Sequence, residues 1–193
     1  MKKDIILSGV GGQGIISIAA IIGSAALAEN LNIKQSEVHG MSQRGGAVMS
    51  NLRISDKPIA SDLIPLGKAD VIISVEPLES LRYLPYLSKE GWLITNLETF
   101  ENIPDYPDIE TLISSIKEIK HHVILNATKI AKEIKAKRSM NTVMLGAALP
   151  FLGLKQESFE AGIKAIFGGK GEQIVNQNLT ALKAGLEEAK KFM

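Results

Sequence analysis

Two glycine-rich segments carry the residues of this sequence that could do chemistry. The first contains Gly9, Gly11 and Gly14 in the spacing G-x-G-x-x-G. It lies between an apolar strand candidate, residues 4–8, and an apolar helix candidate, residues 15–29. Glycines at this spacing allow a tight turn, a close approach of the backbone to an anion, and close packing of the helix on the strand. Because the free N–H groups at the start of the helix would face this loop, an anion-binding site is expected there.

The glycine spacing alone does not select one ligand. A dinucleotide site would place a ribose-binding acid about 20 residues further on, and Glu37 lies near that position. The loop could instead be a turn that only packs the first strand on its helix, or a contact with another chain. Gly12 and Gln13 are not required for dinucleotide binding, so they need a different explanation.

The second segment, residues 36–46, offers a carboxylate, an imidazole and a guanidinium among glycines. Its candidate site residues are Glu37, His39, Gln43, Arg44, Gly45 and Gly46. Since an imidazole titrates near neutral pH, it suits proton handling or an anion contact, and we assign His39 an orienting or contact role. An arginine beside two glycines suits recognition of a phosphate or carboxylate, and equally an interfacial salt bridge.

The composition removes several classes of function. The chain has 193 residues, no cysteine and a formal net charge of +1, so it offers no thiolate to an iron–sulfur cluster and no basic excess for nucleic acid. No histidine has a second ligand at a spacing typical of metal binding. Signal-peptide features are absent, and residues 15–27 are too few for a membrane span. We therefore expect a cytoplasmic protein with no metal, no nucleic-acid partner and no membrane partner.

The predicted elements indicate an α/β fold, and a chain of this length with 45% hydrophobic residues suits one domain. Strands are predicted at residues 4–8, 31–38, 47–54, 59–61, 69–75, 91–96 and 122–126. Helices are predicted at residues 15–29, 78–87, 111–119, 127–137, 140–152, 156–167 and 172–192. Residues 168–171, with Lys170 among glycines, lack the Walker spacing and are interpreted as a loop between two helices.

Several of these elements carry a specific expectation. The first strand, helix and strand imply a parallel, right-handed crossover. Alternation in residues 47–54 predicts a half-exposed strand, at an edge or antiparallel. The run 69–75 suits a central parallel strand buried on both faces. Helix 15–29 is apolar nearly all round, so it should be buried on more than one side, as in a contact with a second subunit. In an open α/β sheet both glycine segments would emerge at the same edge.

Together the two motifs, GVGGQG at residues 9–14 and SEVHGMSQRGG at residues 36–46, resemble the signature of the gamma-type domain of the 2-oxoacid:ferredoxin oxidoreductases. The second motif is most similar to the small (beta) subunits of the indolepyruvate branch and differs from the pyruvate-type gamma subunits. The similarity runs along most of the chain, including NTVMLGAALPFL at residues 141–152. It implies a single gamma-type domain over residues 1–193, Rossmann-like and three-layered, with a mostly parallel sheet, an antiparallel edge and a helical C-terminus.

The resemblance also implies a heteromer. A large (alpha) subunit would hold thiamine diphosphate and Fe-S clusters and would oxidatively decarboxylate arylpyruvates to aryl-acetyl-CoA. CoA would be the co-substrate and ferredoxin the electron acceptor. This chain would hold none of these cofactors and would be inactive alone, in agreement with its lack of cysteine.

On this basis we expect the glycine loop and the second segment to form one surface that faces the large subunit's active site or the CoA entrance. The residues are Gly9, Gly11, Gly12, Gln13, Gly14, Glu37, His39, Gln43, Arg44, Gly45 and Gly46. Three alternatives stay open: a subunit for pyruvate, 2-oxoglutarate or 2-oxoisovalerate, a self-sufficient NAD- or FAD-binding protein, and a non-catalytic scaffold that uses the apolar helix. The isolated chain could also form a homodimer.

Overall fold

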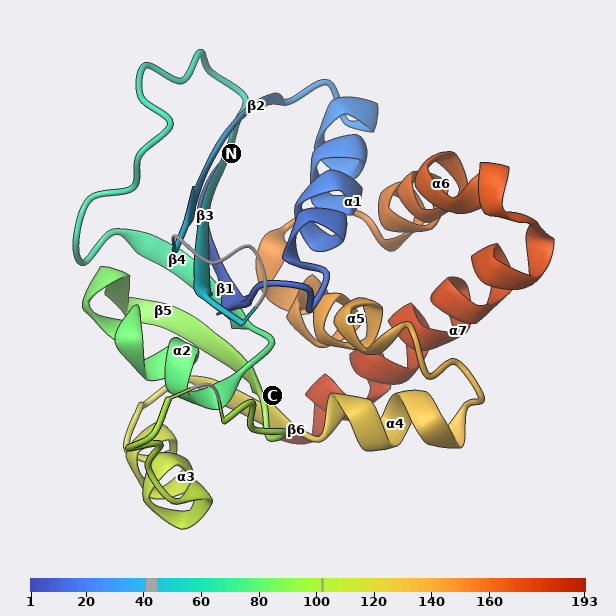
Figure 1. The fold of residues 1–193 in the computed structure, drawn as a ribbon. Coiled ribbons are helices and arrows are strands. Elements are labelled where there is room, and N and C mark those ends of the chain that lie inside the picture. The colour runs from blue at the N-terminus through green and yellow to red at the C-terminus, as the bar shows by residue number, and fades with distance from the viewer. Residues whose placement is uncertain (41–44, 102) are drawn as a thin grey trace.

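The computed structural model describes residues 1–40, 45–101 and 103–193, whose strands form one six-stranded sheet with helices on both faces (Figure 1). The strands are β1 (Lys2–Val10), β2 (Asn32–His39), β3 (Ala47–Ser55), β4 (Ala69–Ser74), β5 (Leu87–Asn96) and β6 (His122–Leu125). The helices are α1 (Ile15–Ala28), α2 (Pro77–Arg82), α3 (Ile109–Lys117), α4 (Ala127–Glu133), α5 (Met140–Leu152), α6 (Gln156–Phe167) and α7 (Glu172–Ala189). Short 3₁₀ turns cover Leu84–Tyr86, Gly168–Lys170 and Lys190–Phe192.

The strand order is β2-β3-β1-β4-β5-β6. Strands β1, β4, β5 and β6 are parallel, whereas β3 is antiparallel to both of its neighbours, β1 and β2. The predicted α/β fold, with a mostly parallel sheet, an antiparallel part at one edge and a helical C-terminus, is confirmed. Since β1 and β2 both oppose β3, they run in the same direction, as the crossover predicts. They are not neighbours, however, because β3 lies between them and pairs with both.

The antiparallel direction predicted for β3 is confirmed, but the prediction that this strand is half-exposed is wrong. Val48 and Leu52 are buried in the core beneath α1. Asn51 is buried on the opposite face, where its side-chain Oδ1 accepts the N–H of Ile64 at 3.1 Å. The polar residue at this alternate position, Asn51, is therefore explained by a buried hydrogen bond and not by exposure to solvent.

Residues 59–61 are not the strand that was predicted. Side chains of the sheet tie this segment down instead. The Arg53 guanidinium donates to the carbonyl oxygens of Ser61 and Leu63, at 3.0 and 2.9 Å. Lys34 Nζ donates to the Ala60 carbonyl oxygen at 3.0 Å. Because these donors satisfy the backbone, the segment needs no partner strand.

The three boundaries that differ most from the predictions are those of α2, β5 and α4. Helix α2 ends at Arg82 rather than at residue 87, because the 3₁₀ turn Leu84–Tyr86 contains Pro85, which cannot donate the hydrogen bond that continues a helix. Strand β5 consequently begins at Leu87, before the predicted residue 91. Helix α4 ends at Glu133, and Lys135 follows with a positive φ of 57°.

Two apolar cores lie on the two faces of the sheet. On one face α1, α4, α5, α6 and α7 cover residues such as Leu7 and Ile73. On the other face α2 and α3 lie over Ile6 and Ile72 (Figure 1). Alternate residues of β1 and β4 enter opposite cores, so these central strands are buried on both sides, as predicted for β4.

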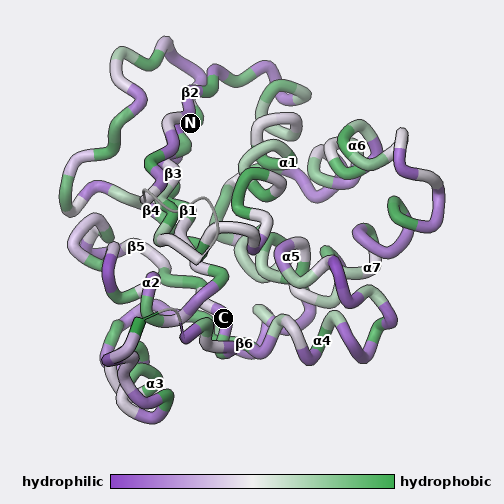
Figure 2. Tube along the Cα trace, viewed as in Figure 1, coloured by the Kyte–Doolittle hydropathy of each residue, from purple (hydrophilic) through white to green (hydrophobic). Residues whose placement is uncertain are grey.

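Helix α1 is buried on more than one side, as predicted, and its cover comes from this chain. Figure 2 shows its hydrophobic run lying between the sheet and α6. Gly162 of α6 lies so close to α1 that a Cβ at this position would be 3.1 Å from the Ile21 carbonyl oxygen. A second subunit is therefore not needed to explain this apolar helix. Within the described residues, no helix combines the length and apolarity required to cross a membrane.

The closest helix crossing joins α5 to α7 and rests on two glycines. A Cβ at Gly185 would overlap the Val143 carbonyl oxygen, and one at Gly146 would overlap the Leu182 carbonyl oxygen. Replacement of Gly185 by alanine should force the helices apart and lower the free energy of unfolding by about 1–3 kcal/mol. Urea denaturation measures this loss. Gly168→Ala is the control, because a Cβ there meets no atom within 4 Å; equal stability of the two variants would contradict the prediction.

Candidate functional site

The two glycine-rich segments meet at the carboxyl edge of the sheet. The glycine loop follows Val10 at the end of β1, and the second segment follows β2. The Gly11 N–H donates to the Gly46 carbonyl oxygen at 2.9 Å, and the Gly40 N–H donates to the Ala47 carbonyl oxygen at 3.0 Å. The first of these hydrogen bonds joins the two motifs directly.

A pocket of about 300 Å³, called here the loop pocket, lies between the glycine loop, the first turn of α1 and the end of β2. Its lining includes Gly11, Gly12, Gly14, Glu37 and His39. The mostly buried Glu37 carboxylate lies 2.8 Å from Nε2 of the half-exposed His39. A protonated His39 would make this an ion pair at the rim of the pocket. The arrangement offers a carboxylate, an imidazole and backbone N–H groups to a molecule that covers it.

The remaining predicted site residues fall into two groups. Gly45 and Gly46 are described and stand next to the glycine loop through the Gly11 contact. Gln43 and Arg44 lie outside the described residues. The predicted role of Arg44 in recognition of an anion or a salt bridge therefore stays a prediction.

Gln13 closes the glycine turn. Its side-chain Oε1 accepts the Val10 N–H at 2.7 Å, and its own N–H donates to the Val10 carbonyl oxygen at 3.1 Å. Gly12 next to it has φ +100°, which disfavours residues with a Cβ. The geometry of this turn therefore explains the presence of Gly12 and Gln13, which a dinucleotide-binding motif does not require.

Replacement of Gln13 by alanine should lower the free energy of unfolding by about 1–3 kcal/mol, because the Val10 N–H loses its acceptor in a partly buried site. Gln13→Glu keeps a side-chain oxygen in place and should lose much less. Thermal or urea unfolding compares the two variants. Equal losses would show that the hydrogen bond contributes nothing.

Asn141 is the site residue that motif analysis missed. It is the second residue of α5, 127 positions beyond Gly14 in sequence, and its Nδ2 donates to the Gly14 carbonyl oxygen at 3.1 Å. A Cβ at Gly14 would lie only 2.5 Å from that Nδ2. The third glycine of the motif thus makes room for a contact with α5. No signal in the local sequence links the two positions.

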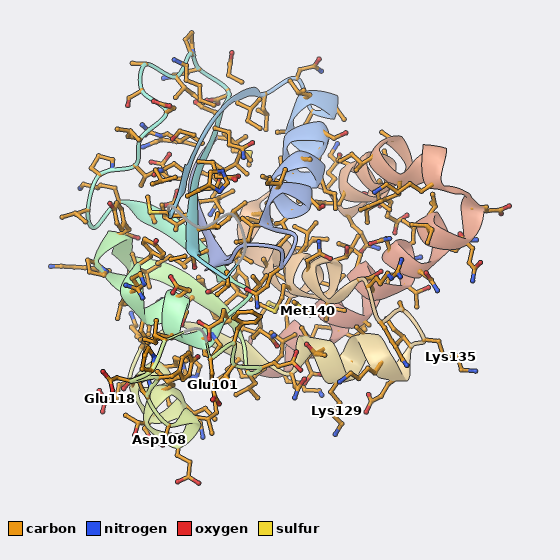
Figure 3. The ribbon with its side chains drawn as sticks, viewed as in Figure 1. Glu101, Asp108, Glu118, Lys129, Lys135 and Met140 are labelled. Carbon is orange, nitrogen blue, oxygen red and sulfur yellow. The ribbon has the colours of Figure 1, made fainter. Side chains whose placement is uncertain are left out.

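A second polar cluster at the same edge is built around Glu76, which is buried two residues after the end of β4. Its carboxylate accepts the N–H of Glu79 at 2.8 Å, the N–H of Phe100 at 3.3 Å and the hydroxyl of Tyr106. Burial and the hydrogen bond to Glu76 raise the pKa of Tyr106 well above its usual range. Because these groups satisfy one another, the cluster anchors the connection between β5 and α3. Glu101 and Asp108, which are labelled in Figure 3, belong to this connection.

The geometry argues against a ribose-binding role for Glu37. In the dinucleotide-binding fold, the strand that carries the acid lies next to the first strand. Here β3 intervenes, so β2 lies two strand spacings, about 10 Å, from β1. The Glu37 carboxylate also lies beside the His39 imidazole, 2.8 Å from Nε2.

The donor groups for a metal cofactor are missing from the described part of the chain. No group of three or more His, Asp or Glu side chains gathers there in a way that could hold a metal ion. The whole sequence lacks cysteine. Because iron–sulfur clusters are held mainly by cysteine thiolates, the residues of this chain do not fit such a cluster.

Comparison with known proteins agrees with the motifs. The family model for pyruvate ferredoxin/flavodoxin oxidoreductases matches residues 4–188. The indolepyruvate oxidoreductase subunit IorB of Methanothermobacter thermautotrophicus is 36% identical over 196 residues, which cover 98% of this chain and 98% of that protein. The 2-oxoglutarate synthase subunit KorC of Methanocaldococcus jannaschii is 34% identical and covers 100% of this chain and 96% of its own length.

A solved structure shares the fold. The gamma subunit of a keto/oxoacid ferredoxin oxidoreductase from Geobacter sulfurreducens superposes with a TM-score of 0.72 at 23% identity, over 98% of this chain and 99% of that one. The family match spans nearly the whole sequence, including both glycine segments and the C-terminal helices. The chain therefore belongs to the pyruvate ferredoxin/flavodoxin oxidoreductase family.

Proposed function

We propose that this chain is the small subunit of an oxidoreductase that acts on indolepyruvate and other arylpyruvates. The observation that carries the proposal is the match to four IorB subunits, at 33–36% identity over 98–100% of this chain. Subunits for other 2-oxoacids match at 30–34%. Full-length similarity to a small subunit supports the same division of labour here.

The cofactors belong to the partner in this proposal. A large (alpha) subunit holds thiamine diphosphate and the iron–sulfur clusters and passes electrons to ferredoxin, with CoA as co-substrate. The lack of cysteine in this chain supports that division, since the chain can supply no thiolate ligand. Residues 1–193 form a single gamma-type domain, which is supported by the one sheet that takes strands from both halves of the chain.

The loop pocket and the two glycine segments around it face the large subunit, at its active site or at the CoA entrance. The Gly11–Gly46 hydrogen bond supports this assignment because it makes one surface of the two motifs. Ile16, which lines the loop pocket, is 62% exposed, as expected for an apolar side chain that a partner covers. The Glu37–His39 pair would then orient groups at that contact.

The test is co-expression with a candidate large subunit that carries thiamine diphosphate and iron–sulfur clusters. Size-exclusion chromatography should show one complex, and anaerobic reduction of an acceptor should require indolepyruvate, CoA and both chains. Absence of a complex would overturn the subunit assignment and favour the NAD- or FAD-binding alternative, which isothermal titration of the lone chain tests. A higher kcat/KM for 2-oxoglutarate or pyruvate than for indolepyruvate would overturn the substrate assignment.

The lone chain provides a further control. It should show no turnover, and its elution volume reports whether it forms a homodimer by itself. The scaffold alternative predicts that only substitutions on α1 affect the complex. Most of α1 is covered by the sheet and α6, and only its Ile16 and Leu27 expose large apolar side chains.

A further inference from the structure

The connection from β5 to α3 carries charge of one sign only. Residues 98–110 contain five aspartates and glutamates and no lysine or arginine. All five carboxylates are exposed, and none of them belongs to an ion pair between described residues. They are Glu98, Glu101, Asp105, Asp108 and Glu110. The described part of this segment, residues 98–101 and 103–110, is called here the acidic surface.

Apolar side chains are exposed among these carboxylates. Phe100 is 44% exposed and Ile103 is 41% exposed. Ile109, the first residue of α3, is 36% exposed. Solvation explains exposed carboxylates, but it does not explain three large apolar side chains within one segment. Apolar side chains with a polar rim are typical of a surface that binds another protein.

Helix α4 and the turn after it carry the opposite charge. Residues 129–138 contain five lysines and arginines and one glutamate. The five cations are exposed, and within the described part of the chain only Lys129 pairs with a carboxylate, that of Glu133 at 4.0 Å. They are Lys129, Lys132, Lys135, Lys137 and Arg138. Residues 129–138 are called here the basic surface.

The two surfaces adjoin at the start of α4. The Thr128 hydroxyl, one residue before the basic surface, donates to the carboxylate of Glu98, the first residue of the acidic surface. Figure 3 shows the labelled Glu101 on one side of this junction and Lys129 and Lys135 on the other, along the lower edge of the molecule. Opposite charges therefore lie side by side on the same part of the protein.

Two-fold symmetry makes this arrangement self-complementary. An axis through the junction places the acidic surface of each copy over the basic surface of the other, so that the same contact forms twice. Complementary charges of this kind fix the register of a complex and speed its formation. Phe100, two residues from the junction at Glu98, would lie near the axis and bury its ring against the other copy.

We propose that a second copy of this chain docks on the acidic and basic surfaces and forms a two-fold symmetric homodimer. A basic partner protein would explain the acidic surface alone. A second copy explains both surfaces and their position next to each other. The inference goes beyond the proposed function, because it concerns a contact between two small subunits and not the contact with the large one.

The test is sedimentation equilibrium of the full chain over a range of concentrations. The weight-average mass should rise from that of one chain, 20.8 kDa, toward twice that value. An increase in salt from about 0.1 to about 1 M should weaken the dimer, because the Debye length falls from about 10 to about 3 Å. Glu101→Lys with Asp105→Lys should raise the dimer Kd at least about tenfold, since like charges then face each other. Lys129→Glu with Lys135→Glu should do the same.

A charge-swapped chain that carries all four substitutions gives the sharpest measurement. The two acid substitutions add four positive charges and the two lysine substitutions remove four, so the net charge stays at +1. The two surfaces exchange signs, and every facing pair of substituted residues is again of opposite charge. This chain should therefore regain most of the affinity that each double variant loses.

The matched control is Glu157→Lys with Glu172→Lys. It adds the same charge as the acid pair, at exposed positions in the first turns of α6 and α7. At about 0.15 M salt it should leave the dimer Kd within about twofold, since exposed charges at a distance are screened. Circular dichroism checks that every variant folds.

The proposal is overturned if the wild-type chain stays a monomer at every concentration, or if neither double variant weakens the dimer more than the control does. A charge-swapped chain that stays monomeric also overturns it, because general repulsion and not facing charges would then explain the losses. Loss of the large-subunit complex in Glu101→Lys with Asp105→Lys, with a monomeric wild-type chain, would assign the acidic surface to that partner. Since the sedimentation uses this chain alone, an active complex beside a monomeric small subunit would disprove this inference and leave the proposed function standing.

Discussion

Replacement of Arg53 by methionine is expected to lower the free energy of unfolding by about 3–5 kcal/mol. Arg53 forms a two-pronged pair with Asp4, from Nε to Oδ1 at 2.8 Å and from Nη2 to Oδ2 at 3.1 Å. Asp4 is only 1% exposed, so the variant leaves a buried carboxylate without its main partner. The same guanidinium holds the carbonyl oxygens of Ser61 and Leu63, which would also be released.

Urea denaturation with two controls tests this prediction. Lys2 Nζ also lies 2.9 Å from Asp4 Oδ2 but is exposed, so Lys2→Met should cost less than about 1 kcal/mol. Removal of both buried charges, by Asp4→Leu with Arg53→Met, should recover part of the loss, because no unpaired charge remains. The Asp4 backbone N–H keeps its acceptor, Asp70 Oδ2, in that variant. If Arg53→Met were no more costly than Lys2→Met, the buried pair would not stabilise the fold.

Gly12→Val should reduce kcat/KM of the assembled complex at least about tenfold, if the loop surface faces the active site as proposed. Gly12 has φ +100°, and a Cβ there meets no atom of this chain within 4 Å. The residue lines the loop pocket. A branched side chain would therefore enter the space that a partner or ligand occupies.

Gly67→Val is the matched control. Gly67 also has a positive φ, +67°, and open space around its Cβ, but it precedes β4 and so lies at the opposite edge of the sheet. Both substitutions carry a similar strain, about 1–2 kcal/mol. Anaerobic assays of the co-purified complexes compare kcat/KM of the two variants, and so separate the effect of backbone strain from the effect of the position of the side chain. Full turnover with Gly12→Val, or an equal loss in both variants, would remove the glycine loop from the functional surface.

The elements with strong local patterns were predicted closely. The bounds of α5 and α6 coincide with the predicted residues 140–152 and 156–167. Glycine at 153 ends α5 in a left-handed conformation, and the apolar runs of β1 and β4 fill the middle of the sheet. Such features depend on neighbours a few residues away, which a single sequence displays directly.

Two of the incorrect predictions concern contacts with residues outside the predicted segment. The alternating residues of β3 looked half-exposed, because the sequence did not show that Asn51 would bond the Ile64 N–H. Residues 59–61 looked like a strand, because their anchoring by Arg53 and Lys34 lies outside the segment. In both cases a polar group found its partner only through the tertiary fold.

By itself, the sequence determined the family motifs, the α/β class, the sheet's central strands and the lack of thiolate ligands. Only the tertiary structure decided the position of β3 between β1 and β2, the Gly11–Gly46 contact and the approach of Asn141 to Gly14. Local propensity and apolar periodicity select helices and strands, since they act over one or two turns of the chain. Strand order and side-chain pairing depend instead on which finished surfaces bury each other. The residues that meet there can lie as far as 127 positions apart in the sequence.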